Sequence, residues 1–406
     1  MSDNRSPIDK MNSSDLRRRD RVGGVVIGGD YQGLGIVRSL GRQGIPVCVI
    51  DDEKSISPYS RYTTISKRVP SLLDPQDAVQ ALLELGRTEG LNGWVVYPTR
   101  DEQVMALSQH RERLSEIFCV PTPHWNTIKW LWDKRNTYSL AEELGIPTPR
   151  TWYPRSLADL DQIEGHFPVA IKPAIKEHFI YATKRKAWRA DNLLQLRDLF
   201  ERASKLIPVD EIMIQDLIPG DGTCQNSFCS FFKQRNSIAH LTACRRRQHP
   251  LEFGRSSTYV ETIELPILQE YSERFLRAID YYGLVEVEYK RDPRDGQYRL
   301  LDVNGRTWGY HTIGRRGGVD FPHLLFADQM NEPVPSGVGK AGLSWIRLLT
   351  DVPTSVVGIL HGQIDWGTFL RSLRDYDEEA VFSLDDPLPG IMELAMVPYL
   401  AAKRGF

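Results

Sequence analysis

The chain has 406 residues, a formal net charge of -2 and 41% hydrophobic residues. This length suits two or three domains with sizeable cores, and the nearly neutral charge gives no support for binding to nucleic acid or to a membrane surface. No apolar run reaches the roughly 18–20 residues that a membrane span needs. The five cysteines include no CxxC pair and indicate a reducing compartment, so we expect a cytoplasmic protein without a membrane span.

The N-terminal third begins with a polar segment and continues as a small α/β domain. Residues 1–20 are rich in Ser and Arg, lack the apolar core of a signal peptide and are expected to form a disordered, mobile tail. An apolar run then ends at Gly28 and Gly29, a helical apolar pattern follows, and a second buried strand ends at Asp51. This order predicts a βαβ unit within an open α/β domain.

The glycine turn of this unit invites a dinucleotide interpretation. The sequence from Gly28 to Gly35 does not fit the GxGxxG fingerprint, although Asp51 has the expected position after the second strand. A nicotinamide-dependent dehydrogenase therefore stays a weak alternative. The turn is instead expected to pack against the sheet, with Gly29 as a candidate for binding substrate at the start of the helix.

A second α/β region begins near residue 123. Its expected elements are a helix over 134–144, ended by Gly145 and Pro147, strands over 167–173 and 212–220, and an amphipathic helix over 267–282. Lys172 stands at the end of a buried strand, which is an unusual place for a solvated lysine. Residues 333–337 have the composition of a linker, and no chemistry can be assigned to the segment that follows it.

The most informative segment is a pair of short strands joined by the turn at 292–296. Glu286 and Glu288 alternate with apolar residues on the first strand, and Asp302 and Asn304 do so on the second. If the two polar faces coincide, three carboxylates and an amide converge. Oxygen ligands without Cys or His suit Mg²⁺ rather than zinc, and Mg²⁺ bound in this way usually shares substrate phosphates. The alternative is an ordinary hairpin with a solvated acidic face.

Taken in order, five segments resemble the ATP-grasp superfamily, and within it the carboxylate–amine ligase group that includes D-aspartate ligase-type enzymes. These segments are Lys134, Ile171 to Ala174, Gln215 to Asp221, Glu288, and Asp302 to Arg306. The resemblance extends over about residues 22–330. The same segments also resemble biotin carboxylase and D-alanine–D-alanine ligase, which are familiar members of this superfamily.

The resemblance implies an α/β fold, with α+β character in parts, built from three units. A Rossmann-like domain at 21–122 precedes a two-lobed ATP-grasp domain at 123–332, whose small lobe covers about 150–218 and whose large lobe covers about 219–332. Residues 333–406 are expected to form a small C-terminal appendage. A homodimer is also implied.

The resemblance further implies which residues bind ATP. Lysines would reach the phosphates, Lys184 and Lys186 would belong to a flexible loop over them, and the backbone of residues 216–218 would contact the edge of adenine. This loop, 176–187, lacks the glycine-rich character of the family, and many members have Glu where this chain has Gln215. The expected ATP-binding set is Lys134, Lys172, Lys184, Lys186, Gln215, Asp216, Leu217, Ile218 and Asp221.

The expected metal ligands are Glu288, Asp302 and Asn304, which would hold Mg²⁺, with Mn²⁺ as an alternative ion. Arg306 matches the arginine that stabilises the transferring phosphate, and Lys172 is expected to share its catalytic role. The candidates for contact with the substrate are Arg255, Ser256, Glu286 and Gly29.

These assignments imply an ATP-dependent ligase that activates a carboxylate as an acyl-phosphate and joins it to an amine. Its partners would be small-molecule carboxylate and amine substrates, and no histidine stands out as the base that deprotonates the amine. Two alternatives within the fold stay open. One is a carboxylase-like enzyme that activates bicarbonate, and the other is a non-catalytic nucleotide-binding protein.

Overall fold

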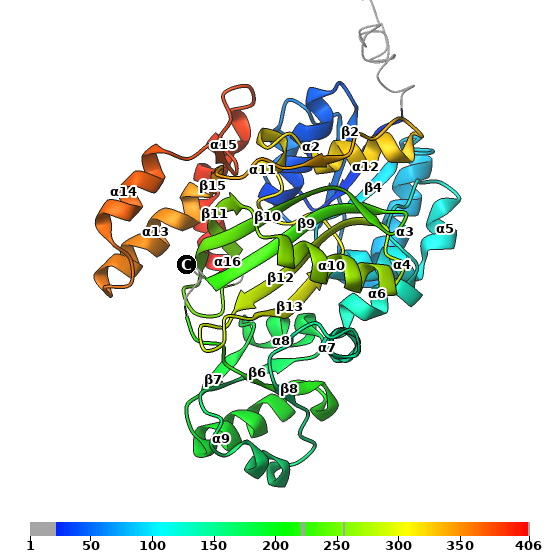
Figure 1. Cartoon of the computed structure of the whole chain (residues 1–406). Coiled ribbons are helices and arrows are strands. Elements are labelled where there is room, and N and C mark those ends of the chain that lie inside the picture. Colours follow the sequence, from blue (N-terminus) through cyan, green and yellow to red (C-terminus); the bar gives the residue numbers. More distant parts are fainter. Residues whose placement is uncertain (1–21, 221–223, 255, 405–406) are drawn as a thin grey trace, which may run out of the picture.

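The structure is a computed structural model that describes residues 22–220, 224–254 and 256–404. The tail expected at 1–20, Asp221 and Arg255 lie outside these residues. Three sheets organise the described chain (Figure 1). Among the described residues, no helix is both long and apolar enough to cross a membrane.

The first sheet is parallel and has the strand order β3-β2-β1-β4. Its strands are β1 (Gly24–Ile27), β2 (Val47–Asp51), β3 (Ile65–Arg68) and β4 (Val95–Pro98), and its helices are α2 (Tyr31–Arg42), α3 (Pro75–Thr88), α4 (Asp101–Gln109) and α5 (Arg111–Ser115). The predicted βαβ unit is confirmed. The Asp30 carboxylate accepts hydrogen bonds from the N–H groups of Gln32 and Gly33, which fixes the start of α2. The chain order reverses between β1 and β4, where open α/β sheets usually bind ligands.

The second sheet has the order β5-β8-β6-β7 and hangs below the others in Figure 1. Helices α6 (Trp125–Trp132) and α7 (Lys134–Glu143) lead into it, and α7 ends before Gly145, as predicted. The strands are β5 (Thr151–Trp152), β6 (Val169–Pro173), β7 (Trp188–Ala190) and β8 (Ile212–Asp216), packed against α8 (Lys176–Thr183) and α9 (Leu193–Ser204). The flexible loop expected at 176–187 is therefore wrong for its first eight residues, which form α8 directly after β6.

The third sheet has the order β13-β12-β9-β10-β11-β15-β16, with β14 paired to β10. The strands are β9 (Gln225–Lys233), β10 (Asn236–His249), β11 (Ser256–Ile263), β12 (Gly283–Arg291), β13 (Tyr298–Asn304), β14 (Gly337–Val338), β15 (Ser344–Ile346) and β16 (Glu378–Glu379). Its nearby helices are α10 (Pro266–Ala278), α11 (Ile313–Arg316) and α12 (Phe321–Gln329). Strands β14, β15 and β16, which come from the segment expected as an appendage, thus belong to the large sheet.

The hairpin predicted from the alternating acids is confirmed as β12 and β13. Glu286 lies opposite Asn304, and Glu288 lies opposite Asp302. Residues directly opposite each other share one face of a sheet, so the four polar side chains converge as the sequence predicts.

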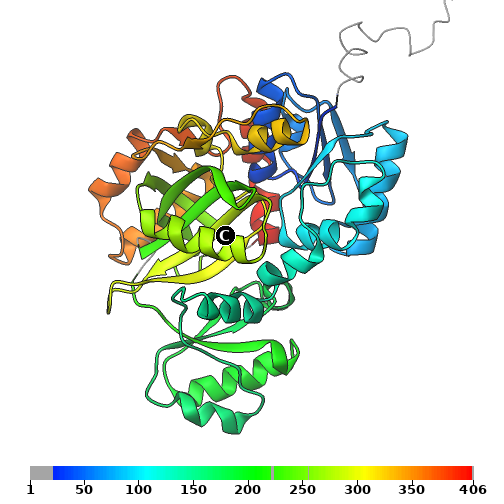
Figure 2. The ribbon, with the colours of Figure 1, turned by 45° about the vertical axis from the view of Figure 1, so that its right-hand side comes forward.

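The C-terminal segment also contacts the first sheet's domain. It contains α13 (Leu348–Leu360), α14 (Trp366–Arg374), α15 (Leu388–Ala395) and α16 (Val397–Arg404). The buried Asp386 carboxylate accepts hydrogen bonds from Arg38 Nε at 2.9 Å and Ser60 Oγ at 2.7 Å. Figure 2 shows the last helices between the N-terminal domain and the large sheet. The three units are therefore joined by polar contacts as well as by apolar packing.

Candidate active site

The centre of the site is the polar face of the β12–β13 hairpin. Asn304 Nδ2 donates to Glu288 Oε1 at 2.9 Å, which ties the two strands together. Lys134, at the start of α7, donates to Asp302 Oδ1. Lys176, at the start of α8, donates to Asn304 Oδ1 at 3.2 Å and lies 3.9 Å from the Asp302 carboxylate. Burial alone would raise the pKa of Asp302, but Lys134 and Lys176 hold that pKa well below its usual range.

Glu288 is surrounded by donors from neighbouring strands. Its Oε2 atom accepts hydrogen bonds from Gln225 Nε2 at 3.0 Å and from Arg245 Nη2 at 3.3 Å. Burial opposes ionisation, yet Arg245 and then Lys186 outweigh it, so the pKa of Glu288 is lowered. Burial also disfavours the charged form of Lys186. Because that form is the protonated one, burial lowers the pKa of Lys186 to about 8. The site therefore holds ionised carboxylates within a set of partly or fully buried cations.

Arg306 follows β13 and reaches across to the first domain. Its Nε and Nη2 atoms donate to the two carboxylate oxygens of Asp101 at 2.8 and 3.0 Å. Lys176 forms an ion pair with the same carboxylate. Burial opposes ionisation of Asp101, but these two cations hold its pKa well below the usual range. Because Asp101 opens α4 just after β4, the strand-order reversal of the first sheet faces the hairpin.

Lys172 marks the other end of the site, in the small lobe. Its Nζ atom donates to Gln215 Oε1 at 2.7 Å and to Tyr138 Oη at 2.9 Å. The Gln215 amide in turn donates to Thr151 Oγ1 at 2.8 Å. Gln215 therefore acts as a neutral acceptor for the lysine, and the structure brings these two predicted residues together.

The backbone of the predicted adenine-reading segment is largely occupied. The N–H groups of Asp216 and Leu217 donate to carbonyl oxygens earlier in the small lobe, at 2.9 and 3.3 Å. The carbonyl of Ile218 accepts a hydrogen bond from Lys290 Nζ at 2.8 Å. Two of the N–H groups therefore complete the small sheet, and contact of the backbone of residues 216–218 with adenine stays a prediction that rests on the remaining groups.

Three other predicted residues lie apart from the hairpin cluster. Lys184 is exposed and occupies the left-handed position after α8, with φ 56°. Gly29 donates its N–H to Asp51 Oδ2 at 2.6 Å, which leaves that group unable to bind a substrate. Ser256 begins β11 opposite His249, and β9 and β10 lie between that strand and β12.

Glu286 lies beside the cluster but has different partners. Its Oε1 atom accepts a hydrogen bond from Tyr310 Oη at 2.6 Å, and its Oε2 atom accepts one from Asn304 Nδ2 at 3.2 Å. Burial, reinforced by the charge of Glu288, raises the pKa of Glu286 to about 7. The two glutamates of one strand are thus in different electrostatic environments.

Sequence reasoning did not assign Asp101, Lys176, Gln225 or Arg245 to the site. Asp101 had a usable signal, because it follows a buried strand of an open α/β sheet. Arg245 stands in the run Arg245 to Arg247, but only the fold separates these arginines: Arg247 pairs with the buried Asp351 of α13 at 2.7 Å. Lys176 was placed in the expected loop, and its role depends on α8.

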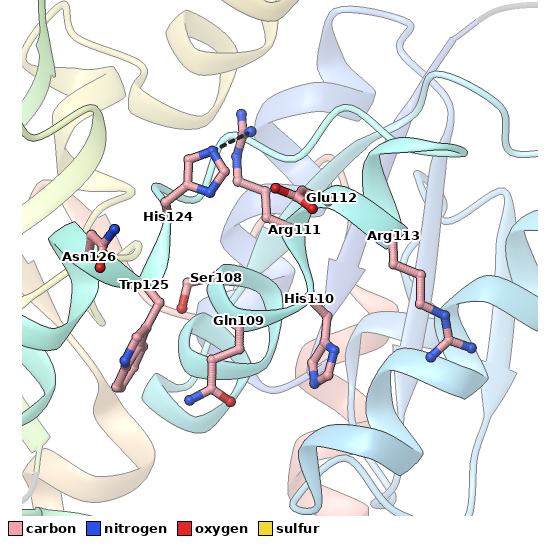
Figure 3. A pocket seen from close by; sticks show the side chains of 9 residues that line it. All are labelled: Ser108, Gln109, His110, Arg111, Glu112, Arg113, His124, Trp125 and Asn126. Atoms are coloured by element: carbon pink, nitrogen blue, oxygen red, sulfur yellow. Dashed lines mark hydrogen bonds between the residues drawn. The ribbon is translucent and has the colours of Figure 1, made fainter.

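The cavities agree with this location only in part. A small cavity of about 20 Å³ adjoins the cluster and is lined by Asp101, Lys134, Lys176, Glu177, Asp302 and Gly305, among others. A larger one of about 350 Å³ lies between the end of α4 and the start of α6 (Figure 3). There Arg111 points toward His124, whereas Arg113 points away. The larger cavity contains none of the hairpin residues, so we place the chemistry at the hairpin.

Comparisons with known proteins define the class. No family model matches the sequence. The structure resembles an L-amino acid ligase from Bacillus licheniformis, with TM-score 0.59, 16% identity and coverage of 76% of this chain and 74% of that one. It also resembles the biotin carboxylase domain of 2-oxoglutarate carboxylase from Hydrogenobacter thermophilus, solved as a dimer with magnesium ADP and bicarbonate. There the TM-score is 0.63, the identity 15% and the coverage 79% and 73%. The fold is that of the ATP-grasp enzymes.

A sequence relative narrows the class further. A D-aspartate ligase from Enterococcus faecium (strain Aus0004) is 24% identical over 364 residues, which is 82% of this chain and 83% of that protein. The chain therefore resembles the ATP-grasp carboxylate–amine ligase group in sequence as well as in fold. Both this relative and one of the structural neighbours are named ligases.

Proposed function

We propose that the enzyme phosphorylates a carboxylate of an amino acid with ATP and joins the resulting acyl-phosphate to an amine. Aspartate and glutamate are the acids that we favour, because the sequence relative is named a D-aspartate ligase. The observation that carries the proposal is the acidic hairpin surrounded by cations from the large and small lobes, two of which a carboxylate of the first domain contacts. Arg245 and Arg306 come from the large lobe, and Lys176 and Lys186 come from the small lobe. Asp101 of the first domain contacts both Arg306 and Lys176.

The donor set of the hairpin fits Mg²⁺. Glu288 and Asp302 supply two carboxylates and Asn304 an amide oxygen, while the described residues contain no group of three His, Cys, Asp or Glu that could form a complete cage. Mg²⁺ is usually held by one or two carboxylates together with substrate phosphates, so a complete protein cage is unnecessary. When bound, the ion would neutralise the charge that develops on the phosphates.

The cations around the hairpin would have different roles in binding ATP and in phosphoryl transfer. Lys134 donates to Asp302 and Lys176 donates to Asn304, and both lysines would contact phosphate oxygens once nucleotide and metal bind. Lys172 and Gln215, in the small lobe, would hold the α-phosphate and the adenine side of the nucleotide. Arg306 would stabilise the phosphoryl group during its transfer and then the acyl-phosphate. Such preorganised charges, rather than covalent chemistry, lower the barrier to phosphoryl transfer.

The order of steps follows from this arrangement. The acid's carboxylate oxygen attacks the γ-phosphorus in line, the bond to ADP breaks, and the amine then attacks the acyl carbon and expels phosphate. The small lobe carries Lys172, Lys176 and Lys186, so its closure over the hairpin would exclude water that otherwise hydrolyses the intermediate. We further propose a cytoplasmic location. We also propose a homodimer, for which the dimeric biotin carboxylase domain offers a precedent of the same fold.

A bicarbonate-activating enzyme is the second candidate, since a structural neighbour of that kind shares the fold. The sequence relative favours the amine ligase. A non-catalytic role is disfavoured by the complete set of charged groups around the hairpin.

The test is ADP release from magnesium ATP with pooled D- and L-amino acids as acids and amines, and with bicarbonate as a separate arm. Stimulation by amino acids that disappears in Asp302→Ala is expected. Asp295→Ala is the matched control, because Asp295 lies in the turn of the same hairpin, where its carboxylate accepts from Arg299 Nη2 at 2.6 Å and from the Gln297 N–H at 3.0 Å. Stimulation by bicarbonate alone would contradict the amine ligase, and so would an Asp302→Ala enzyme of unchanged activity.

A further inference from the structure

Two buried polar atoms, one on β11 and one directly after β15, lack partners within the described residues. They are Arg347 Nε and Thr258 Oγ1. Arg347 is 5% exposed and Thr258 is fully buried. Buried polar groups are nearly always hydrogen-bonded, because leaving one unpaired opposes folding. Two such atoms at one place therefore point to a ligand that supplies the missing partner.

The register brings the two residues together. Tyr259 lies opposite Ile346, and the N–H of Arg347 donates to the carbonyl of Thr258 at 2.9 Å. Arg347 and Thr258 are thus the next opposed pair, and opposed residues share one face of the sheet. One atom is a donor and the other is a hydroxyl, so a single carboxylate can accept from both.

This face is the one that carries the reactive hairpin. Pairing runs from Glu288 through Ser227 and Ala243 to Thr262. Directly opposed residues share a face, and Thr258 is four residues from Thr262 on the same strand, so it projects to the same side. Thr258 and Arg347 therefore lie on the same face of the large sheet as the hairpin carboxylates, and this face packs against the first domain.

A row of aromatic rings extends from the hairpin to Arg347. Tyr310 donates to Glu286, its ring lies 6.2 Å from that of Trp345, and the Trp345 ring lies 6.3 Å from that of Tyr31. The Arg347 guanidinium lies 4.0 Å from the centre of the Tyr31 ring. Tyr31 opens α2 directly after the glycine turn of the first sheet, so the ligand would be enclosed between two domains.

The charge at this place selects the kind of anion. Arg347 already pairs with the buried Glu393 of α15 at 2.9 Å. One carboxylate neutralises one guanidinium, so this place offers hydrogen-bond donors without net positive charge. It therefore does not suit a triphosphate, for which the cations around the hairpin are available, whereas a single carboxylate can accept from Arg347 Nε and Thr258 Oγ1. Planar guanidinium groups also match carboxylate geometry.

We propose that Arg347 and Thr258 bind the second carboxylate of the acid substrate, the one that is not phosphorylated, and so select amino dicarboxylic acids. The proposal rests on the proposed ligase function and adds the residues that determine its acid specificity.

The test compares aspartate and glutamate, in both enantiomers, with the monoamides in which one or the other carboxylate is replaced. The readout is kcat/KM in magnesium-ATP-dependent ADP release. We expect the wild type to prefer a dicarboxylate at least tenfold over its better monoamide. Thr258→Val, which removes only the hydroxyl, should reduce that preference at least fivefold through KM for the acid, with KM for ATP unchanged. Arg347→Lys should reduce it further.

The matched control is Thr262→Val, on the same strand and face. The Thr262 hydroxyl already donates to the Lys340 carbonyl at 2.9 Å, so its loss should lower the thermal unfolding temperature and leave acid preference unchanged. An unchanged preference in a folded Thr258→Val and in Arg347→Lys would overturn the proposal while leaving the ligase intact.

A second measurement separates failure of the subsite from failure of the ligase. Aspartate or glutamate should raise the unfolding temperature of the wild type and not that of Thr258→Val, whether or not turnover is detected. If no acid stimulates ADP release, such a difference would support the subsite and contradict the proposed reaction. If no acid stimulates ADP release and no such difference in unfolding temperature is found, both the subsite and the proposed reaction are overturned.

Discussion

Asp101 and Arg306 are separated by 205 positions and form a two-point ion pair, with distances of 2.8 and 3.0 Å. The carboxylate opens a helix of the first domain, and the arginine follows the last strand of the hairpin. The same carboxylate pairs with Lys176 of the small lobe. One side chain therefore joins the first domain to both lobes at the point where we place phosphoryl transfer.

Asp101→Asn should lower kcat strongly. The amide keeps the shape but loses the charge that orients Arg306 and Lys176, and displacement of a catalytic group by about 1 Å can cost about 10²-fold in rate. Steady-state ADP release measures the change. Glu102→Gln is the control, because Glu102 is the next residue but contacts Tyr181 at 2.7 Å instead of the cations. Equal losses in both variants would argue against a specific role for Asp101.

Lys172→Met should raise KM for ATP about 10- to 100-fold, since a hydrogen bond to a charged group contributes about 1.5–3 kcal/mol. Lys184→Met should change it less than about twofold, because Lys184 is exposed after α8 and a solvated charge contributes little. Initial rates over a range of ATP concentrations decide the comparison. A large effect of Lys184→Met would restore the predicted role of that lysine over the phosphates.

The pH dependence of ATP capture should reflect Lys186. Burial lowers its pKa to about 8, so the ammonium is present below that pH and is lost as the pH rises through it. Because kcat/KM reports groups of the free enzyme, kcat/KM for ATP should fall above about pH 8. Lys186→Arg, whose charge persists, should abolish this decline. An identical alkaline limb in the variant would assign the decline to another group.

Asp386→Asn should destabilise the protein far more than Asp385→Asn. Asp386 is 1% exposed and compensates the buried Arg38, and breaking such a pair typically costs about 3–5 kcal/mol. Asp385 pairs with Arg42 at the surface, where an ion pair contributes about 0–1 kcal/mol. Thermal unfolding of the two variants side by side provides the measurement. Similar unfolding temperatures would indicate that the C-terminal segment is not held by this contact.

The bicarbonate alternative and the ligase also differ in a directly measurable product. The ligase should yield an amide whose mass equals the sum of acid and amine minus water, and Arg306→Lys should lower its rate because a point charge cannot replace the planar guanidinium. Mass spectrometry of the reaction checks both statements. ADP formation without such a product would indicate uncoupled hydrolysis.

Much of the fold was accessible from local patterns. Alternation of acids with apolar residues on two adjacent strands predicted the hairpin, because side chains of a strand alternate between faces and the short turn leaves few possible registers. The βαβ unit and the end of α7 at Gly145 followed from similar local rules. The family resemblance added the nucleotide and the order of the lobes, which no periodicity reveals.

Only the tertiary structure decided which distant side chains complete the site. Asp101, Lys176 and Arg245 come from three separate sequence regions, and their meeting depends on how the sheets pack. Arg245 and Arg247 stand two residues apart, yet a break in strand register between them goes with separate partners, Glu288 and Asp351. The sequence by itself therefore determined the two strands that carry the carboxylates, because strand geometry is local. The surrounding cations were decided by long-range packing, which no local pattern encodes.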